Sequence, residues 1–446
     1  MIKKKSFDVR DLASLLGSIT APGSLSDFSD GLCTKHGNII RRRHDFHPDD
    51  IPFQWEPIPW YSLGSRCVNS PVGPTRTLAY ASGAYFVQDA GSLLALALAE
   101  ADKPSGDPLL ICDLCAAPGA KASALLELAE QNGGFLLANE VIGSRIAALS
   151  SNLSRTGSDR FAISSLDASE LADKLGSIFD LVLVDAPCSG QAMLSRGKQS
   201  LASFSKQQIE HSALRQHRIL DAATRLIKPS GKLVYSTCTF AEDENESQVK
   251  RLIDSGSVEN ISDPTLAQYQ TDRGCYRLWP HIHQCAGSFG AAMRYIGNHH
   301  TSRHRWKHSQ KHRINIPLDD WYIDRFSTAR LHQINASLIA WPQDAPQWVE
   351  EISCTGPEIA YRTGQTWKPS HAGALRDSDQ FQTRNRLEID AEQANKYLQG
   401  ETISVDKNGW TAIFYNKRPL GWTKASGGKG KNHLPTHARF NSALMH

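Results

Sequence analysis

Short apolar runs alternate with amphipathic segments between residues 84 and 251, and this alternation constrains the fold more than any other feature of the chain. The strands are expected at residues 109–114 and 134–139, and the helices at residues 120–131, 143–155 and 206–227. The last of these helices runs into Lys-Pro-Ser-Gly, a basic turn followed by proline and glycine stop signals. Regular alternation of this kind predicts an α/β domain with a doubly wound parallel sheet.

The regions on either side of the alternation differ from it in composition. Residues 1–80 look loop-rich and are predicted to form a small N-terminal appendage to a domain over residues 81–295. Residues 296–316 are predicted to be a basic linker, because residues 294–313 hold six Lys or Arg, five His and no acid. That segment could bind phosphate or simply be a solvated connector. Residues 317–446 are predicted to form a small β-rich C-terminal region.

Composition excludes some classes of protein. The 446-residue chain is 40% hydrophobic and 21% charged, and its longest apolar run, residues 93–99, is much shorter than the ~18 residues of a membrane helix. No secretory signal follows the basic start, so we expect a cytoplasmic protein with no membrane partner. The nine cysteines are an odd number and predict free thiols rather than a disulfide framework. The net charge of +3 permits RNA binding without requiring it.

Two cysteines each follow a short apolar run that is predicted to be a buried strand. Cys188 follows residues 179–184, and Cys238 follows residues 232–235. Both would lie at the carboxyl ends of strands, the edge at which open α/β sheets bind their ligands. The pair therefore predicts a thiolate nucleophile with a second thiol beside it.

The segment over residues 111–121 is predicted to run from a strand through a tight turn into a helix. Its small residues would let a ligand approach the backbone, and the helix start offers unpaired N–H groups. It lacks the spaced glycines of a dinucleotide site and the ending of a P-loop. Glu140, at the end of the next strand, could accept hydrogen bonds from ribose hydroxyls, and Asp167 could reach an adenine amino group. Each acid could instead be a helix cap.

Cys112 and Cys115 form a C-x-x-C pair, which can indicate zinc or redox chemistry. Zinc needs a second pair of ligands, and the histidine series at residues 304, 308 and 312 lies far along the chain. A thiol oxidoreductase would need a thioredoxin-like start, which is absent here. We therefore expect no metal, and we expect these cysteines to fill space beside the turn.

Three ordered motifs carry a resemblance to a known family. They are Leu-Cys-Ala-Ala-Pro-Gly-Ala-Lys at residues 114–121, Asp-Ala-Pro-Cys-Ser-Gly at residues 185–190, and Ser-Thr-Cys-Thr at residues 236–239 followed by Glu-Asn-Glu at residues 244–246. Together they resemble the S-adenosylmethionine-dependent RNA cytosine-5 methyltransferases, the Nop/Sun family. The resemblance covers roughly residues 55–295. Residues 421–433 resemble the C-terminal PUA-like RNA-binding module of bacterial ribosomal RNA methyltransferases.

This resemblance implies a fold, a cofactor and a set of site residues. The fold would be a Rossmann-like methyltransferase domain with a small PUA-like RNA-binding domain, and the cofactor would be S-adenosyl-L-methionine. The implied cofactor-binding residues are Cys115, Ala116, Ala117, Pro118, Gly119, Ala120, Lys121, Glu140, Asp167 and Asp185. The implied catalytic residues are Cys238, Cys188, Asp185 and Lys121.

Each catalytic residue has an expected role. The resemblance makes Cys238 the nucleophile that adds to carbon 6 of cytosine, and Cys188 the thiol that helps release the enzyme from its product. Lys121, near a helix N-terminus, is expected to favour the thiolate of Cys238. Asp185 is expected to hydrogen-bond the N3/N4 edge of the base. The acidic run over residues 242–246 is expected to start a helix, where carboxylates suit the helix dipole.

The expected substrate is RNA with an unstacked cytosine, and no obligate protein partner is evident. The resemblance of the C-terminal module implies small-subunit (16S) ribosomal RNA. The expected phosphate contacts are residues 41–43, residues 294–313, Lys424, Lys429 and Lys431. Two alternatives stay open. Transfer RNA could be the substrate, or departures from the motifs at Ala120, residues 191–192 and residues 287–290 could mark a non-catalytic RNA-binding or ribosome-assembly protein.

Overall fold

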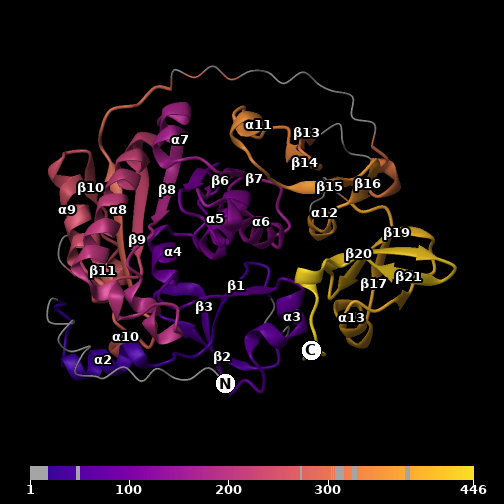
Figure 1. Cartoon of the computed structure of the whole chain (residues 1–446), viewed down its shortest axis with the longest axis horizontal. Coiled ribbons are helices and arrows are strands. Elements are labelled where there is room, and N and C mark those ends of the chain that lie inside the picture. The colour runs from indigo at the N-terminus through magenta and orange to yellow at the C-terminus, as the bar shows by residue number, and fades with distance from the viewer. Residues whose placement is uncertain are drawn as a thin grey trace.

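The computed structural model describes residues 19–46, 51–271, 274–302, 304, 306, 316–323, 329–376 and 382–445. Within these residues the strands form four sheets, one of which has eight strands (Figure 1). In Figure 1 this central sheet lies on the left, and the two C-terminal sheets lie on the right. The predicted segment over residues 294–313 falls partly outside the described residues, which omit 303, 305 and 307–315.

The central sheet has the order β10-β12-β9-β8-β5-β6-β7, with β11 paired to β12. Its strands are β5 (Leu110–Asp113), β6 (Phe135–Asn139), β7 (Phe161–Ser164), β8 (Phe179–Asp185), β9 (Ile227–Thr237), β10 (Val258–Asn260), β11 (Cys275–Leu278) and β12 (Ser288–Tyr295). The strands from β9 to β7 are parallel, whereas β10, β11 and β12 pair in antiparallel fashion. The predicted doubly wound α/β sheet is therefore confirmed, with an antiparallel margin.

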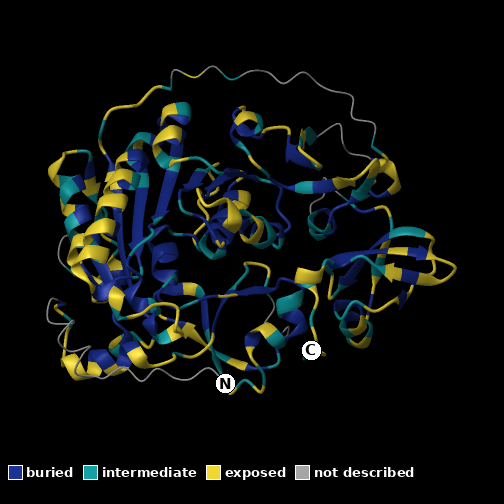
Figure 2. Cartoon of the chain, in the orientation of Figure 1, coloured by how far each residue is buried: buried dark blue, intermediate teal, exposed yellow. Residues whose placement is uncertain are grey.

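Helices cover both faces of this sheet, because successive strand side chains point to opposite sides. One face packs against α4 (Leu93–Leu98), α5 (Ala120–Gln131) and α6 (Ile146–Ser154). The other packs against α7 (Ala168–Leu175), α8 (Lys206–Leu226) and α9 (Glu246–Asp254). The strands between these two layers are buried over most of their length (Figure 2).

The predicted helices and strands differ from the observed ones mainly at their ends. Helix α5 has the predicted bounds, but the predicted helix over residues 143–155 begins with a 3₁₀ turn before α6. Helix α8 ends at Leu226, and the stop segment after it already belongs to β9, because Ile227 pairs with Phe179 of β8. Pairing with a strand that is distant in sequence thus extends β9 through residues that the sequence predicts to form a turn.

The composition of residues 1–80 suggested a loop-rich region, but the described residues of this region form several strands and helices. It forms a sheet of order β2-β3-β1-β4, with α2 (Leu25–Cys33), α3 (Leu78–Ala81) and α10 (Pro280–His283) beside it. The strands are β1 (Ile39–Arg42), β2 (Gln54–Ile58), β3 (Tyr61–Val68) and β4 (Tyr85–Val87). These strands are short and contain Arg, Pro and Gln, so they lack the alternating apolar pattern that signals a strand.

The C-terminal region contains two further sheets. The first has the order β13-β14-β15-β16 and comprises β13 (Ala329–Ile334), β14 (Ser337–Pro342), β15 (Glu358–Thr363) and β16 (Thr366–Pro369), with α11 (Val349–Ile352) and α12 (His371–Leu375). The second has the order β17-β19-β20-β21-β18 and comprises β17 (Arg386–Glu388), β18 (Ile403–Ser404), β19 (Gly409–Tyr415), β20 (Arg418–Ser426) and β21 (Lys429–Asn432), with α13 (Ala391–Leu398). The predicted β-rich region is confirmed, while the division of the chain at residues 80, 295 and 316 stays a prediction.

Backbone contacts tie the C-terminal region to the rest of the chain. Thr355 forms an antiparallel bridge with Ile163 of β7, so it covers the outer edge of the central sheet. The Trp341 indole donates a hydrogen bond to the carbonyl oxygen of Phe161 at 2.9 Å. At the very end of the chain, Met445 forms a parallel bridge with Thr77 of the N-terminal region.

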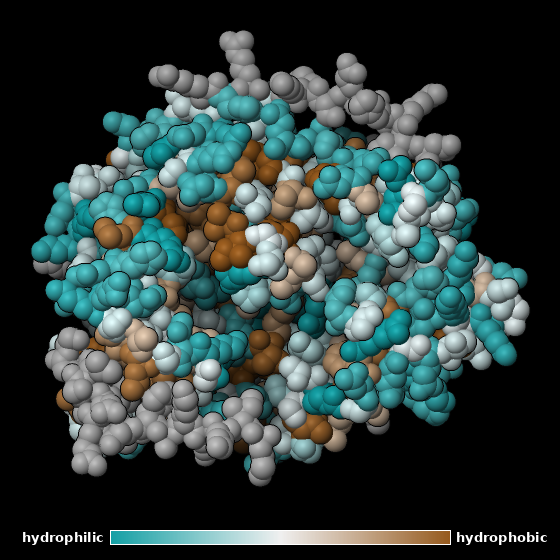
Figure 3. Space-filling view, in the orientation of Figure 1, coloured by the Kyte–Doolittle hydropathy of each residue, from teal (hydrophilic) through white to brown (hydrophobic). Residues whose placement is uncertain are grey.

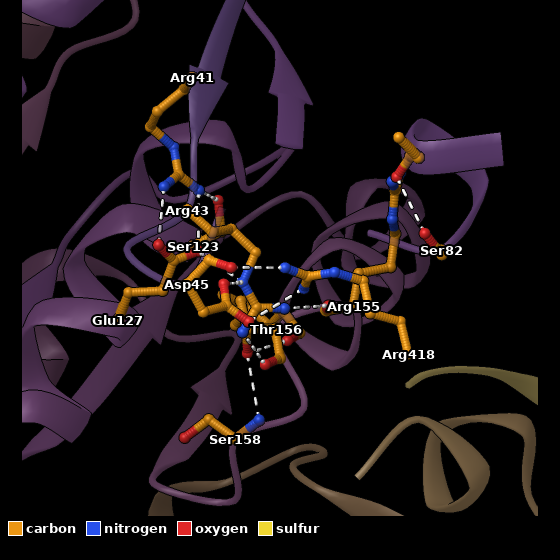
Figure 4. Close-up of polar contacts among 12 residues, drawn as sticks. Arg41, Arg43, Asp45, Ser82, Ser123, Glu127, Arg155, Thr156, Ser158 and Arg418 are labelled. Carbon is orange, nitrogen blue, oxygen red and sulfur yellow. Dashed lines mark hydrogen bonds and ion pairs between the residues drawn. The ribbon is translucent and has the colours of Figure 1, made fainter. Parts of the chain in front are cut away.

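A network of arginines lies where these regions meet (Figure 4). Arg41 is completely buried, and its guanidinium binds both carboxylate oxygens of Glu127, at 2.9 and 3.2 Å. Asp45 accepts contacts from Arg43 at 3.3 Å and from Arg418 of β20 at 3.0 Å. Beside the network is a cavity of about 1190 Å³ lined by the N-terminal sheet region, α5, α6, α12 and the β19–β20 hairpin.

The expectation that Arg41 binds phosphate is therefore wrong, whereas for Arg42 and Arg43 it stays a prediction. Arg41 has no exposed surface, and Arg43 also donates hydrogen bonds to the carbonyl oxygens of Arg155 and Thr156. A buried guanidinium needs a carboxylate and several acceptors to offset its lost hydration, and the junction supplies them. These arginines hold the junction together.

No helix among the described residues combines the length and apolar character needed to cross a bilayer. On the face drawn in Figure 3 the surface is mainly hydrophilic, and hydrophobic side chains gather in separate areas near its middle.

We expect Arg41→Ala to lower the free energy of unfolding by about 3 kcal/mol, because it leaves the buried carboxylate of Glu127 without its main partner. Urea unfolding followed by circular dichroism would measure this. The control is Arg218→Ala, which removes an exposed arginine from α8 and should change stability by less than about 0.5 kcal/mol. Equal stability of the two variants would contradict the structural role of Arg41.

Candidate active site

The candidate site lies where the strand order of the central sheet reverses. The chain passes from β5 outward through β6 to β7, and then returns to β8 and β9 on the other side of β5. The crevice at the carboxyl ends of β5 and β8 is the place where open α/β sheets bind ligands. The three motifs follow β5, β8 and β9, so all of them meet at this crevice.

The two motif cysteines are in contact. Their Sγ atoms lie 3.1 Å apart, and the backbone N–H of Cys238 points to the sulfur of Cys188 at 3.4 Å. The hydrogen bond to Cys238, together with burial, raises the pKa of the Cys188 thiol well above its usual value. Cys188 therefore keeps its proton near neutral pH.

Lys121 and Asp185 form an ion pair next to these thiols. The Lys121 ammonium donates to Asp185 Oδ2 at 2.7 Å, and the Ser236 hydroxyl donates to Asp185 Oδ1 at 2.6 Å. Burial disfavours the charged form of Lys121, but the carboxylate of Asp185 outweighs this and raises its pKa above the usual value. A fixed positive charge thus lies between the helix start of α5 and the Thr-Cys-Thr motif.

Glu244 is a buried carboxylate that joins the two cysteine motifs, a role that the sequence did not reveal. It accepts hydrogen bonds from the backbone N–H of Ser189 at 2.9 Å, from the Ser189 hydroxyl, from Thr239 Oγ1 at 3.3 Å and from Gln216 Nε2 at 2.9 Å. Burial raises its pKa, while these donors act in the opposite direction. Ser189 follows Cys188 and Thr239 follows Cys238, so one carboxylate fixes both thiol-bearing loops.

Residues around this carboxylate complete the support of the loop after β9. Asn245 accepts from Thr237 Oγ1 at 2.6 Å and donates to the carbonyl oxygen of Thr239 at 2.9 Å. The side chain of Gln191, at a position that departs from the family pattern, accepts the backbone N–H of Phe240 at 2.9 Å. The acidic run does begin a helix, since α9 starts at Glu246, but two of its members also position the site.

The predicted cofactor loop occupies the turn between β5 and α5. Gly119 has φ of +112°, and a Cβ there would lie 2.9 Å from Cβ of Asn152, so only glycine fits. The unpaired N–H groups of the first turn of α5 and the small residues before it leave the backbone open to a ligand. These features fit a nucleoside cofactor.

Glu140 lies at the carboxyl end of β6, as predicted, and is buried. One carboxylate oxygen accepts the N–H of Ile142 at 2.8 Å, and the other pairs with Arg145 at 2.9 Å. Arg145 also donates to the carbonyl oxygen of Ala117 in the cofactor loop. Arg145, which sequence analysis missed, thus links the acid to the loop.

Asp167 is exposed and caps α7, accepting the N–H of Ser169 at 2.8 Å. The helix-cap alternative is therefore realised, and contact with an adenine stays a prediction.

Asp113, at the end of β5, is a second buried acid that sequence analysis did not single out. Burial and the neighbouring Asp185 carboxylate raise its pKa to about 7, although Lys121 acts in the opposite direction. Its only signal in the sequence is its place directly before the cofactor loop.

Cys112 is a buried residue of β5 and packs in the core, and burial raises the pKa of both Cys112 and Cys115 well above the usual value. Among the described residues, no group of three or more His, Cys, Asp or Glu side chains is arranged to hold a metal ion.

The pH dependence of stability tests the environment of Asp113. Between about pH 5 and pH 7 the folded protein holds a proton on Asp113 that the unfolded chain has released, so stability falls as pH rises. The limiting slope from this group is about 1.4 kcal/mol per pH unit. Asp113→Asn removes it, and the difference between wild type and variant in urea unfolding should vary with pH. A difference that is constant across this range would contradict a raised pKa.

Comparisons with known proteins agree with this geometry. Residues 96–294 match the model of the 16S rRNA methyltransferase RsmB/F family, and residues 384–440 match the RsmF PUA domain. The chain is 28% identical to a ribosomal RNA small subunit methyltransferase F of Cronobacter sakazakii, over 86% of this chain and 85% of that protein. It is 29% identical to the same-named protein of Aeromonas hydrophila, over 86% of each chain. A methyltransferase homologue of Pyrococcus horikoshii has 25% identity and a TM-score of 0.52, covering 60% of this chain and 90% of that one.

The fold and the site together define a methyltransferase with an appended PUA domain. The chain contains a methyltransferase domain of the RsmB/F type over residues 96–294 and a PUA domain of the RsmF type over residues 384–440, as its motifs predicted.

Proposed function

We propose that this protein transfers a methyl group from S-adenosyl-L-methionine to carbon 5 of a cytosine in RNA, through a covalent bond from Cys238. The observation that carries the proposal is the contact between the Cys238 and Cys188 sulfurs at 3.1 Å, at the reversal point of the sheet. One sulfur attacks while its neighbour keeps its proton, and the cofactor loop opens onto the same crevice.

Carbon 5 of cytosine is a weak nucleophile until a group adds to carbon 6. When the Cys238 sulfur bonds to carbon 6, the ring becomes an enamine whose carbon 5 can take a methyl group. Bound S-adenosyl-L-methionine supplies that group from its sulfonium. A base then removes the proton from carbon 5, the double bond re-forms, and the Cys238 thiolate leaves. Cys188 assists this release, directly or through a water.

Lys121 and Asp185 act as one unit in this scheme. The ammonium favours the thiolate of Cys238, and its pairing with Asp185 keeps it in place. Asp185, held also by Ser236, can meet the N3/N4 edge of the base as charge develops on the ring. The loop over residues 115–121, together with Glu140, Asp167 and Asp185, would hold the cofactor.

The names of the similar proteins favour ribosomal RNA of the small subunit over transfer RNA as the substrate. The ion pair and the thiol contact argue against a non-catalytic protein. A site that had lost its activity would not be expected to retain a buried carboxylate that holds both cysteine loops.

Substitution of the two cysteines should give opposite results. Cys238→Ala should abolish transfer of labelled methyl groups to unmodified small-subunit RNA, whereas Cys188→Ala should accumulate a covalent RNA adduct on a denaturing gel. Cys33→Ser, which changes an exposed thiol, is the control and should do neither. Full activity of Cys238→Ala would refute the nucleophile, and absence of an adduct would refute the release role of Cys188.

Glu244→Ala should lower kcat roughly 100-fold with little change in RNA affinity, because it frees the two thiol loops from one another. Glu242→Ala, an exposed acid in the same turn, should keep wild-type kcat. Steady-state methylation kinetics and a binding isotherm measure the two quantities. A kcat for Glu244→Ala equal to that of Glu242→Ala would show that the clamp does not position the thiols.

A further inference from the structure

A row of aromatic and basic side chains crosses the sheet of β17–β21 at its outer end. Trp410 of β19 is the cross-strand partner of Lys424 in β20, and Lys424 is the partner of Lys431 in β21. Directly opposite residues in antiparallel strands project to the same face. Lys429 joins them, because it is paired with Ser426, two residues beyond Lys424.

This row is the uncovered end of a face that is otherwise buried. Further along the same face Ala412, Phe414 and Trp422 pack in a core shared with the β13–β16 sheet. Lys424, at the outer end, is exposed, and Figure 2 shows yellow at the ends of β20 and β21. The neighbouring Ala425 points to the other face and is buried against the α13 side. The lysines of the row therefore face solvent, whereas Trp410 is half-buried because it packs against this core.

His433 extends the aromatic surface. Its ring lies 4.4 Å from that of Trp410, and the Lys424 ammonium lies 5.7 Å from the Trp410 ring centre. Burial, followed by Lys431, Lys368 and Lys424, lowers the pKa of His433. At neutral pH His433 is thus an uncharged ring surrounded by three ammonium groups.

Lys368 comes from β16, in the other C-terminal sheet, and outside the residues that match the PUA domain model. The surface is therefore composite and is formed only when the two sheets meet. Among the described residues, none of Lys368, Lys424, Lys429 and Lys431 has an ion pair, whereas Lys396 on α13 pairs with Glu392 at 2.7 Å. The positive charge of this surface is left uncompensated.

We propose that this surface, which we call the Trp410 platform (Trp410, His433, Lys368, Lys424 and Lys431), binds a single-stranded segment of RNA. Bases stack on the two rings, and phosphates lie against the lysines. Stackable rings among uncompensated ammonium groups fit a polyanion that carries planar bases, the arrangement by which proteins hold single strands without reading their sequence. A duplex keeps its bases stacked on each other and cannot use the rings.

The platform would hold RNA away from the reacting base. In Figure 1 β20 and β21 lie at the opposite side of the molecule from β9 and α8, whereas Cys238 follows β9. RNA bound at the platform is thus a strand that flanks the target cytosine. In this respect the inference rests on the proposed function, but binding itself does not require methyl transfer.

Binding of a labelled single strand of about 12 nucleotides to the full-length protein, without methyl donor, tests the platform. We expect Trp410→Ala to weaken the affinity at least roughly fivefold, and Trp410→Tyr to restore most of it. The combined Lys368→Ala, Lys424→Ala and Lys431→Ala variant should reduce the slope of log affinity against log salt by about 2. Lys396→Ala, on the opposite face of the same sheet, is the matched control. Thermal unfolding confirms that each variant is folded.

The outcomes separate the platform from the reaction. A folded triple variant with wild-type affinity and salt slope overturns the platform, as does a Trp410→Ala variant that weakens a duplex of equal length as much as the single strand. A wild-type protein that binds no single strand also overturns it. If wild type fails to methylate cytosine but these variants still lose affinity, the proposed function fails and the platform stands.

Discussion

The parallel pairing of β8 with β9 is the constraint on which the geometry of the candidate site depends. Its register sets Asp185 opposite Ser236, so both strands end at the same level of the sheet. Two thiols that are fifty residues apart in sequence are thereby brought into contact, and the buried Glu244 carboxylate joins the loops that carry them. Moving this register by one residue would turn one cysteine loop away from the crevice, because successive residues of a strand face opposite sides.

Basic side chains serve two separate purposes in this molecule. Arginines such as Arg41 and Arg376 are buried, and each pairs with an acid, Glu127 or Asp159, at a boundary between regions. A planar guanidinium can satisfy several acceptors at once, which suits it to such buried boundaries. The lysines of the Trp410 platform form no ion pair among the described residues, so their charge is available to the proposed RNA ligand. The mild net charge of the chain conceals this division.

The strands and helices of the central domain were predictable because their signals are local. The periodicity of apolar residues, the turn at Gly119 and the residues that stop a helix each depend on only a few neighbouring positions. The motifs then identify the residues that follow the ends of the strands. Glu244 was not predictable as a clamp, since its partners Ser189 and Gln216 lie far away in sequence. Arg41 looked like part of a basic surface because its partner is also distant in sequence. That partner, Glu127, lies eighty-six residues later, and the two side chains meet in the interior.

The bridge between Met445 and Thr77 joins two segments that lie far apart in the sequence. The entropy lost in closing a loop grows only slowly with its length, so this contact costs little more than one between nearer segments. Contacts of such long sequence separation form slowly, because the chain must bring distant parts together before the contact stabilises them. We therefore expect the junction of Thr77 with Met445 to be among the later contacts to form during folding.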